Sequence, residues 1–107
     1  MKLGIVIYST DSEVVWNAFR LGVFALTQRR DRVRVFLLAG GVECETLDTD
    51  KFEVTAQMQA FVDAGGVIHA CGSCLEIRRQ EGTSLCPVST LADLYDLIQD
   101  ADKVVSF

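Results

Sequence analysis

The spacing of short apolar runs is the feature of this chain that most constrains its fold. Each run is rich in β-branched residues and lies next to a stretch with helical periodicity. Runs that are apolar on both faces are typical of strands buried in a parallel sheet, and helices that alternate with such strands cover its faces. The sequence therefore predicts one α/β domain over residues 1–107, a flavodoxin-like three-layer sandwich with a mainly parallel sheet. The expected strands occupy residues 3–8, 32–38, 67–70 and 103–107.

The first expected helix, over residues 13–30, carries more apolar surface than one monomer needs. Its apolar side chains spread over an arc of roughly 220°, wider than the stripe of an ordinary surface helix. Phe24 projects from the polar side of this helix, where the core of one monomer cannot reach it. We therefore expect a homo-oligomer whose interface includes this helix.

Two further helices are expected, one around residues 54–62 and one around residues 91–101. Between the first two helices, residues 43–50 are polar and are expected to form a loop. The last helix is expected to present one apolar face, formed by Leu91, Leu94, Tyr95, Ile98 and Ala101.

Composition narrows the possible partners. Half of the 107 residues are hydrophobic and the formal net charge is −5, so neither nucleic acid nor an anionic membrane is expected as a partner. The apolar run at residues 3–8 is too short for a signal peptide and is expected to be a strand. We therefore expect a cytoplasmic protein, in which the four cysteines are reduced and serve catalysis or metal binding rather than disulfides.

The motif Cys71-Gly72-Ser73-Cys74 lies between the third expected strand and a helix start. Unpaired N–H groups at a helix start favour thiolate over thiol, which makes a cysteine there a better nucleophile and metal ligand. Because ligands of parallel α/β sheets bind outside the carboxyl ends of the strands, Cys71 and Cys74 are the predicted reactive residues. The alternative is that both thiols are small buried apolar side chains.

Cys44 and Cys86 are expected near the same edge of the sheet, where they are weaker candidates because each is isolated. Four thiols would suffice for zinc, but these two lie far apart in the sequence and do not form a second pair beside Cys71 and Cys74. The turn at residues 9–12 also lacks the glycine of a flavin phosphate loop. We therefore expect neither metal nor cofactor.

Two other side chains near the motif carry possible roles. Arg78 lies one helical turn after Cys74, so its guanidinium can lean back toward the thiols, or it can be a solvated surface charge. His69 could act as a general base, although a histidine on a short strand more often packs or donates a hydrogen bond.

Several short segments together resemble the DsrE-like family, which includes sulfur-relay subunits. The resemblance extends from the first strand to the last. It implies a flavodoxin-like α/β fold, cytoplasmic homo- or hetero-oligomers such as trimers or hexamers, and a cysteine at the end of the third strand that carries sulfur as a persulfide. The segments are Gly41–Cys44, Ala70–Leu75, Arg78, Leu85–Ser89 and Asp102–Val105.

Carried over residue by residue, the persulfide cysteine falls on Cys71. Cys74 matches a second thiol found in some members, and Arg78 matches a recurrent arginine. Arg79 stands where many relatives have glycine. The hypothesis is a sulfur carrier with sulfurtransferase-like activity that works with other sulfur-relay proteins. Two alternatives stay open: a noncatalytic oligomeric binding module with structural or zinc-binding cysteines, and a dithiol oxidoreductase that uses Cys71 and Cys74.

Overall fold

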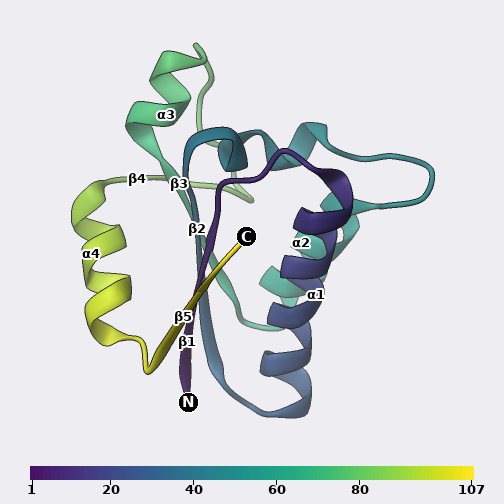
Figure 1. Ribbon diagram of the computed structural model, residues 1–107, viewed down its shortest axis with the longest axis vertical. Helices are drawn as coiled ribbons and strands as arrows, with labels where there is room; N and C mark the ends of the chain where they lie inside the picture. Colours follow the sequence, from purple (N-terminus) through teal and green to yellow (C-terminus); the bar gives the residue numbers. More distant parts are fainter.

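The computed structural model describes all 107 residues and is built on a five-stranded sheet with helices on both faces (Figure 1). Every strand pairs in parallel with its neighbours, in the order β4-β3-β2-β1-β5. This confirms the predicted α/β class and makes the sheet wholly rather than mainly parallel. The strands are β1 (Lys2–Ile7), β2 (Arg32–Leu37), β3 (Val67–Cys71), β4 (Val88–Ser89) and β5 (Lys103–Ser106).

The helices form two layers, with α1 and α2 on one face of the sheet and α4 on the other (Figure 1). The Asp11 carboxylate caps α1 by accepting the Val14 N–H at 3.0 Å. No helix combines the length and apolar character needed to cross a membrane. The helices are α1 (Ser12–Gln28), the 3-10 helix η1 (Ala39–Thr46), α2 (Val54–Asp63), α3 (Gly72–Ile77) and α4 (Leu91–Asp100).

Most of the core lies between the sheet and the α1–α2 layer. Phe19 of α1 and Phe61 of α2 are fully buried and meet edge to face, with ring centroids 5.7 Å apart. Gly22 lets the two helices approach closely, because a Cβ there would lie 2.7 Å from the Phe61 ring. This side of the sheet is packed as the apolar runs predict.

The expected apolar face of α4 is wrong in one respect. Leu97 is the residue of α4 that is buried, whereas Leu91 and Tyr95 are 67% and 66% exposed. The cause is Gly4 on β1, where a Cβ would lie 2.4 Å from the Leu97 side chain. The absence of a side chain at Gly4 leaves room for Leu97 against the sheet. The stripe of α4 that contains Leu91 and Tyr95 therefore faces solvent.

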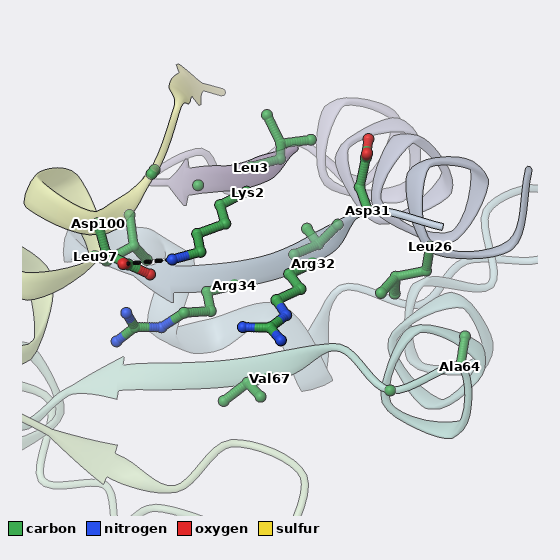
Figure 2. A pocket seen from close by; sticks show the side chains of 14 residues that line it. Lys2, Leu3, Leu26, Asp31, Arg32, Arg34, Ala64, Val67, Leu97 and Asp100 are labelled. Carbon is green, nitrogen blue, oxygen red and sulfur yellow. Dashed lines mark hydrogen bonds and ion pairs between the residues drawn. The ribbon is translucent and has the colours of Figure 1, made fainter. Parts of the chain in front are cut away.

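Because α4 is the only long helix on its face, part of the sheet there is uncovered. A cavity of about 470 Å³ lies at the amino-terminal end of β1, β2 and β3. Figure 2 shows Arg32 and Arg34 projecting from β2 beside this cavity. The nearby Lys2 is paired with Asp100 of α4 at 3.0 Å. This region lies at the opposite end of the strands from Cys71.

The first half of the expected polar loop at residues 43–50 is instead helical, since η1 spans Ala39–Thr46, whereas residues 47–50 lie outside any helix or strand. Two glycines explain why it packs closely against the sheet. A Cβ on Gly41 would lie 2.0 Å from the Ile7 carbonyl oxygen, and a Cβ on Gly40 would lie 2.5 Å from Thr10. Only glycine can lie this close to the end of β1, and the two glycines thus allow η1 to pack against the carboxyl edge of the sheet.

Candidate functional site

Cys71 and Cys74 come together where β3 passes into α3. Cys71 is the last residue of β3 and the N-cap position of α3, and Cys74 lies three residues further on, within the first turn of α3. The nearby Cys71 contributes to a raised pKa at Cys74. Cys71 is only 4% exposed, whereas Cys74 is partly open to solvent. The pair is therefore one unit with a buried and an accessible member.

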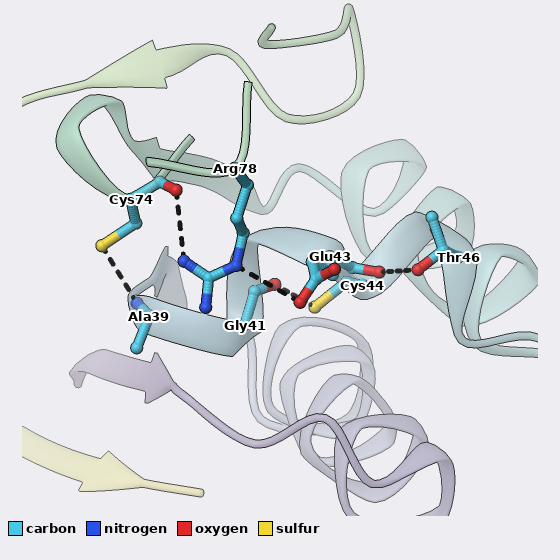
Figure 3. A network of polar contacts seen from close by, with 7 residues as sticks. All are labelled: Ala39, Gly41, Glu43, Cys44, Thr46, Cys74 and Arg78. Atoms are coloured by element: carbon cyan, nitrogen blue, oxygen red, sulfur yellow. Dashed lines mark hydrogen bonds and ion pairs between the residues drawn. The ribbon is translucent and has the colours of Figure 1, made fainter. Parts of the chain in front are cut away.

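The Cys74 sulfur has a hydrogen-bond donor from a different segment of the chain. The backbone N–H of Ala39, the first residue of η1, donates to Cys74 Sγ at 3.2 Å (Figure 3). Ala39 has a φ of 51°, a left-handed conformation that is uncommon for a residue other than glycine. Such strained residues cluster at functional sites, where the rest of the fold holds them in place. The strain here aims an N–H at a sulfur atom.

Arg78 is held beside the thiol pair rather than free in solvent. Its Nε donates to Glu43 Oε2 at 3.3 Å and its Nη1 donates to the Cys74 carbonyl oxygen at 3.2 Å (Figure 3). Both bonds fix the guanidinium over the first turn of α3, which is one of the two alternatives that the helical spacing left open. The ion pair is also half-buried, which strengthens it relative to a fully solvated pair.

Opposing effects set the acidity of Cys74. Burial raises the pKa of the Cys74 thiol above its ordinary value, and the contact with Cys71 raises it further. The Ala39 N–H and the positive charge of Arg78 act in the opposite direction by favouring the thiolate. Since burial is the largest effect, Cys74 is chiefly a thiol at neutral pH, with a thiolate that two neighbours stabilise once it forms.

Cys44 and Cys86 occupy a separate, buried environment. The Cys44 thiol donates to the Gly41 carbonyl oxygen at 2.7 Å, and burial raises its pKa to about 12. Burial, followed by the charge of Glu45, also raises the pKa of Cys86. Both thiols therefore stay protonated at neutral pH, which favours a packing role for them. All four cysteines are free, and no three of the His, Cys, Asp and Glu side chains are grouped to hold a metal ion.

His69 packs within the fold on the α4 side of the sheet. Its ring stacks against Phe36 with centroids 6.4 Å apart, and its Nε2 lies 3.5 Å from Nη2 of Arg34. Burial, followed by the charge of Arg34, lowers the pKa of His69. A neutral ring that accepts from Arg34 fits the packing interpretation rather than that of a general base for the thiols.

Sequence reasoning missed two contributors to this site, Ala39 and Glu43. Ala39 acts through its backbone N–H, which no residue type reveals. Glu43 acts through Arg78, from which it is separated by α2, β3 and α3. The one signal in the sequence is Gly40-Gly41 directly after an apolar strand, a pair typical of a tight turn at a sheet edge.

A parallel sheet with a thiol pair at the carboxyl end of its third strand is the arrangement that the family resemblance implies. Residues 1–107 match the DsrE/DsrF-like family, and the chain belongs to that family. Among solved structures it is similar to the YchN protein of E. coli, with 18% identity, a TM-score of 0.83 and complete coverage of both chains. That likeness shows the shared fold. No curated protein matches the sequence.

Proposed function

We propose that this chain is a sulfur carrier of the sulfur-relay type, which holds sulfane sulfur as a persulfide on Cys71. Membership of the DsrE/DsrF-like family supports the general role in sulfur relay. The observation that supports the specific residue is the position of Cys71 at the carboxyl end of β3, beside a second thiol. A reactive group at that edge is where parallel α/β sheets place their chemistry.

The surroundings of the pair favour protein partners over a small organic substrate. Neither Cys71 nor Cys74 lines the 470 Å³ cavity, the cavity of about 240 Å³ beside α3, or two more open surface cavities. Cys71 itself is buried, so another protein's thiol would reach the outer sulfur of the persulfide from the rim of the sheet, where Cys74 is partly exposed. We infer that the chain acts in the cytoplasm, as a homo-oligomer, and exchanges sulfur with other relay proteins.

Intact-mass analysis tests this proposal. Reduced wild-type protein, Cys71→Ser and Cys74→Ser are treated briefly with inorganic polysulfide, quenched by alkylation and weighed. Wild type and Cys74→Ser should each gain one sulfur atom, and Cys71→Ser should gain none. Gain in Cys71→Ser but not in Cys74→Ser would move the persulfide to Cys74.

A matched control uses the buried thiols. Cys86→Ala should load as wild type does, because burial and the charge of Glu45 raise the pKa of Cys86 and keep its thiol protonated. If no variant gains sulfur, including the wild type, the carrier proposal is wrong. If the double variant lacking Cys71 and Cys74 still gains sulfur, the reactive thiol lies outside the candidate site.

A further inference from the structure

A persulfide on Cys71 would have a second thiol against it. Cys71 and Cys74 are three residues apart across the start of α3, and side chains at that spacing share one face of a helical turn. Both cysteines are free, so both thiols are available for reaction. A carrier that only stores sulfur has no need of such a neighbour, because a thiol in contact with a persulfide can react with it.

The geometry indicates which sulfur of the persulfide Cys74 would attack. A persulfide has an inner sulfur, here Cys71 Sγ, and an outer sulfane sulfur one bond further out, about 2 Å away. Cys71 is the N-cap of α3 and Cys74 is its third residue, so both side chains start from the same helical turn. Attack on this inner atom closes a disulfide, whereas attack on the outer atom would only move the sulfane sulfur to Cys74. The Cys-x-x-Cys spacing, which suits an intramolecular disulfide, therefore favours attack on the inner sulfur.

The hydrogen bonding indicates that Cys74 is the attacking thiol. Its Sγ accepts the Ala39 N–H at 3.2 Å and lies close enough to Arg78 to respond to its charge. Both neighbours stabilise a negative sulfur. Cys74 is also the more exposed of the two thiols, so bases in solvent can take its proton. Cys71 is buried, as suits the sulfur that is attacked rather than the one that attacks.

We propose that this chain discharges its own persulfide as sulfide, with Cys74 as the resolving thiol, so that it has sulfane-sulfur reductase activity as well as carrier activity. The proposal rests on the proposed function, because it needs the persulfide on Cys71. The ligand class is a sulfane-sulfur donor, and the second substrate is a dithiol reductant that reopens the resulting disulfide.

The step balances without any external oxidant. An electron pair of the Cys74 thiolate forms a bond to Cys71 Sγ, and the bond between Cys71 Sγ and the outer sulfur breaks with its pair on the outer sulfur. The outer sulfur leaves as HS⁻ and is protonated by water. Sulfane sulfur is thereby reduced to sulfide while two thiols are oxidised to one disulfide. A dithiol reductant then restores both thiols by exchange.

The environment of Cys74 would slow this discharge, so that sulfur transfer to an acceptor protein can compete with it. Burial raises the pKa of Cys74, so only a minor fraction is thiolate at neutral pH. An acceptor protein that docks promptly would take the outer sulfur first. Without an acceptor, the sulfur leaves as sulfide, and the rate of loss should rise with pH as Cys74 ionises.

A single-turnover experiment tests the proposal. Wild type, Cys74→Ser and the control Ser73→Ala are loaded with polysulfide and freed of small molecules by gel filtration. Sulfide in solution and intact mass are then followed over time. Wild type and Ser73→Ala should release one sulfide per loaded chain, and each product should weigh two hydrogen atoms less than the reduced protein. Cys74→Ser should keep its added sulfur at least ~10-fold longer, because it lacks the intramolecular nucleophile.

The outcomes separate this inference from the carrier function. If wild type keeps its persulfide as long as Cys74→Ser does, discharge is refuted and the carrier function stands. If Cys71→Ser loads and Cys74→Ser does not, the assigned roles are wrong. If neither wild type nor Cys74→Ser gains sulfur, both proposals fail. Sulfide release without the mass of a disulfide product would also refute the mechanism, because the electrons would then come from another source.

Discussion

Replacing Gly41 with alanine should destabilise the protein strongly, because this position lies against main chain rather than a movable side chain. A Cβ there would lie 2.0 Å from the Ile7 carbonyl oxygen, which already accepts the Leu38 N–H at 2.9 Å. The end of β1 cannot move away easily, since β1 pairs with β2 on one side and β5 on the other. We expect η1 to shift instead, at a cost of about 3 kcal/mol, the upper part of the range for overpacking.

Thermal unfolding measured by circular dichroism gives the size of this destabilisation. A domain of this size loses roughly 4–8 °C of Tm per kcal/mol, so Gly41→Ala should unfold at least about 12 °C below wild type. Gly65→Ala is the matched control, since Gly65 has a φ of +100° and a Cβ added there would have nothing within 4 Å. Its cost is the left-handed conformation alone, about 1 kcal/mol, and its Tm should fall by about 4–8 °C.

Hydrogen exchange locates the disturbance. The Leu38 and Gly41 amides donate to Ile7 and Leu38 respectively, both at 2.9 Å, and should lose protection in Gly41→Ala but keep it in Gly65→Ala. If Gly41→Ala unfolds no earlier than the control, η1 is not seated on β1 as described. The Ala39 N–H would then not be fixed on Cys74 by this contact.

Three further changes test the charge and the surfaces described above. In a Cys71→Ser background, Arg78→Ala should raise the apparent pKa of Cys74, because a positive charge that favours the thiolate is removed. The profile of alkylation rate against pH should then shift to higher pH. An unchanged profile would mean that Arg78 has only a structural role. Phe24→Glu should weaken a homo-oligomer by several kcal/mol in light scattering if α1 forms the interface, since it buries an unpaired charge. Tyr95→Glu is the comparison on the more exposed face of α4, and dissociation by this variant alone would place the interface there. A wild-type protein that is monomeric at micromolar concentration would contradict both.

The strands and the first helix could be predicted because their buried positions are occupied by apolar residues at regular spacing. Residues 32–38 read as an apolar run since both faces of β2 are covered near its carboxyl end, and the observed β2 ends one residue earlier. The observed α1 starts at Ser12, one residue before the expected start, with Asp11 as its N-cap. The position of Cys71 and Cys74 at the carboxyl edge followed from the same alternation of strands and helices.

The parts of the fold and the site that the sequence did not predict depend on contacts between segments that are distant in the sequence. Residues 43–46 look polar, yet Cys44 is fully buried because η1 folds against β1 through Gly41. The buried side of α4 is decided by the room left at Gly4, which lies at the other end of the chain. Likewise, the sequence places two thiols together but does not show that Cys71 is covered while Cys74 is open and receives the Ala39 N–H.

The two edges of the sheet are its shortest strands, with two residues in β4 and four in β5. An exposed edge offers unpaired backbone N–H and C=O groups to any extended chain, and short edge strands limit that hazard. Side-by-side joining of sheets into fibrils is therefore disfavoured. A homo-oligomer of this chain would have to form through helix surfaces, where side chains rather than backbone groups decide which partner fits.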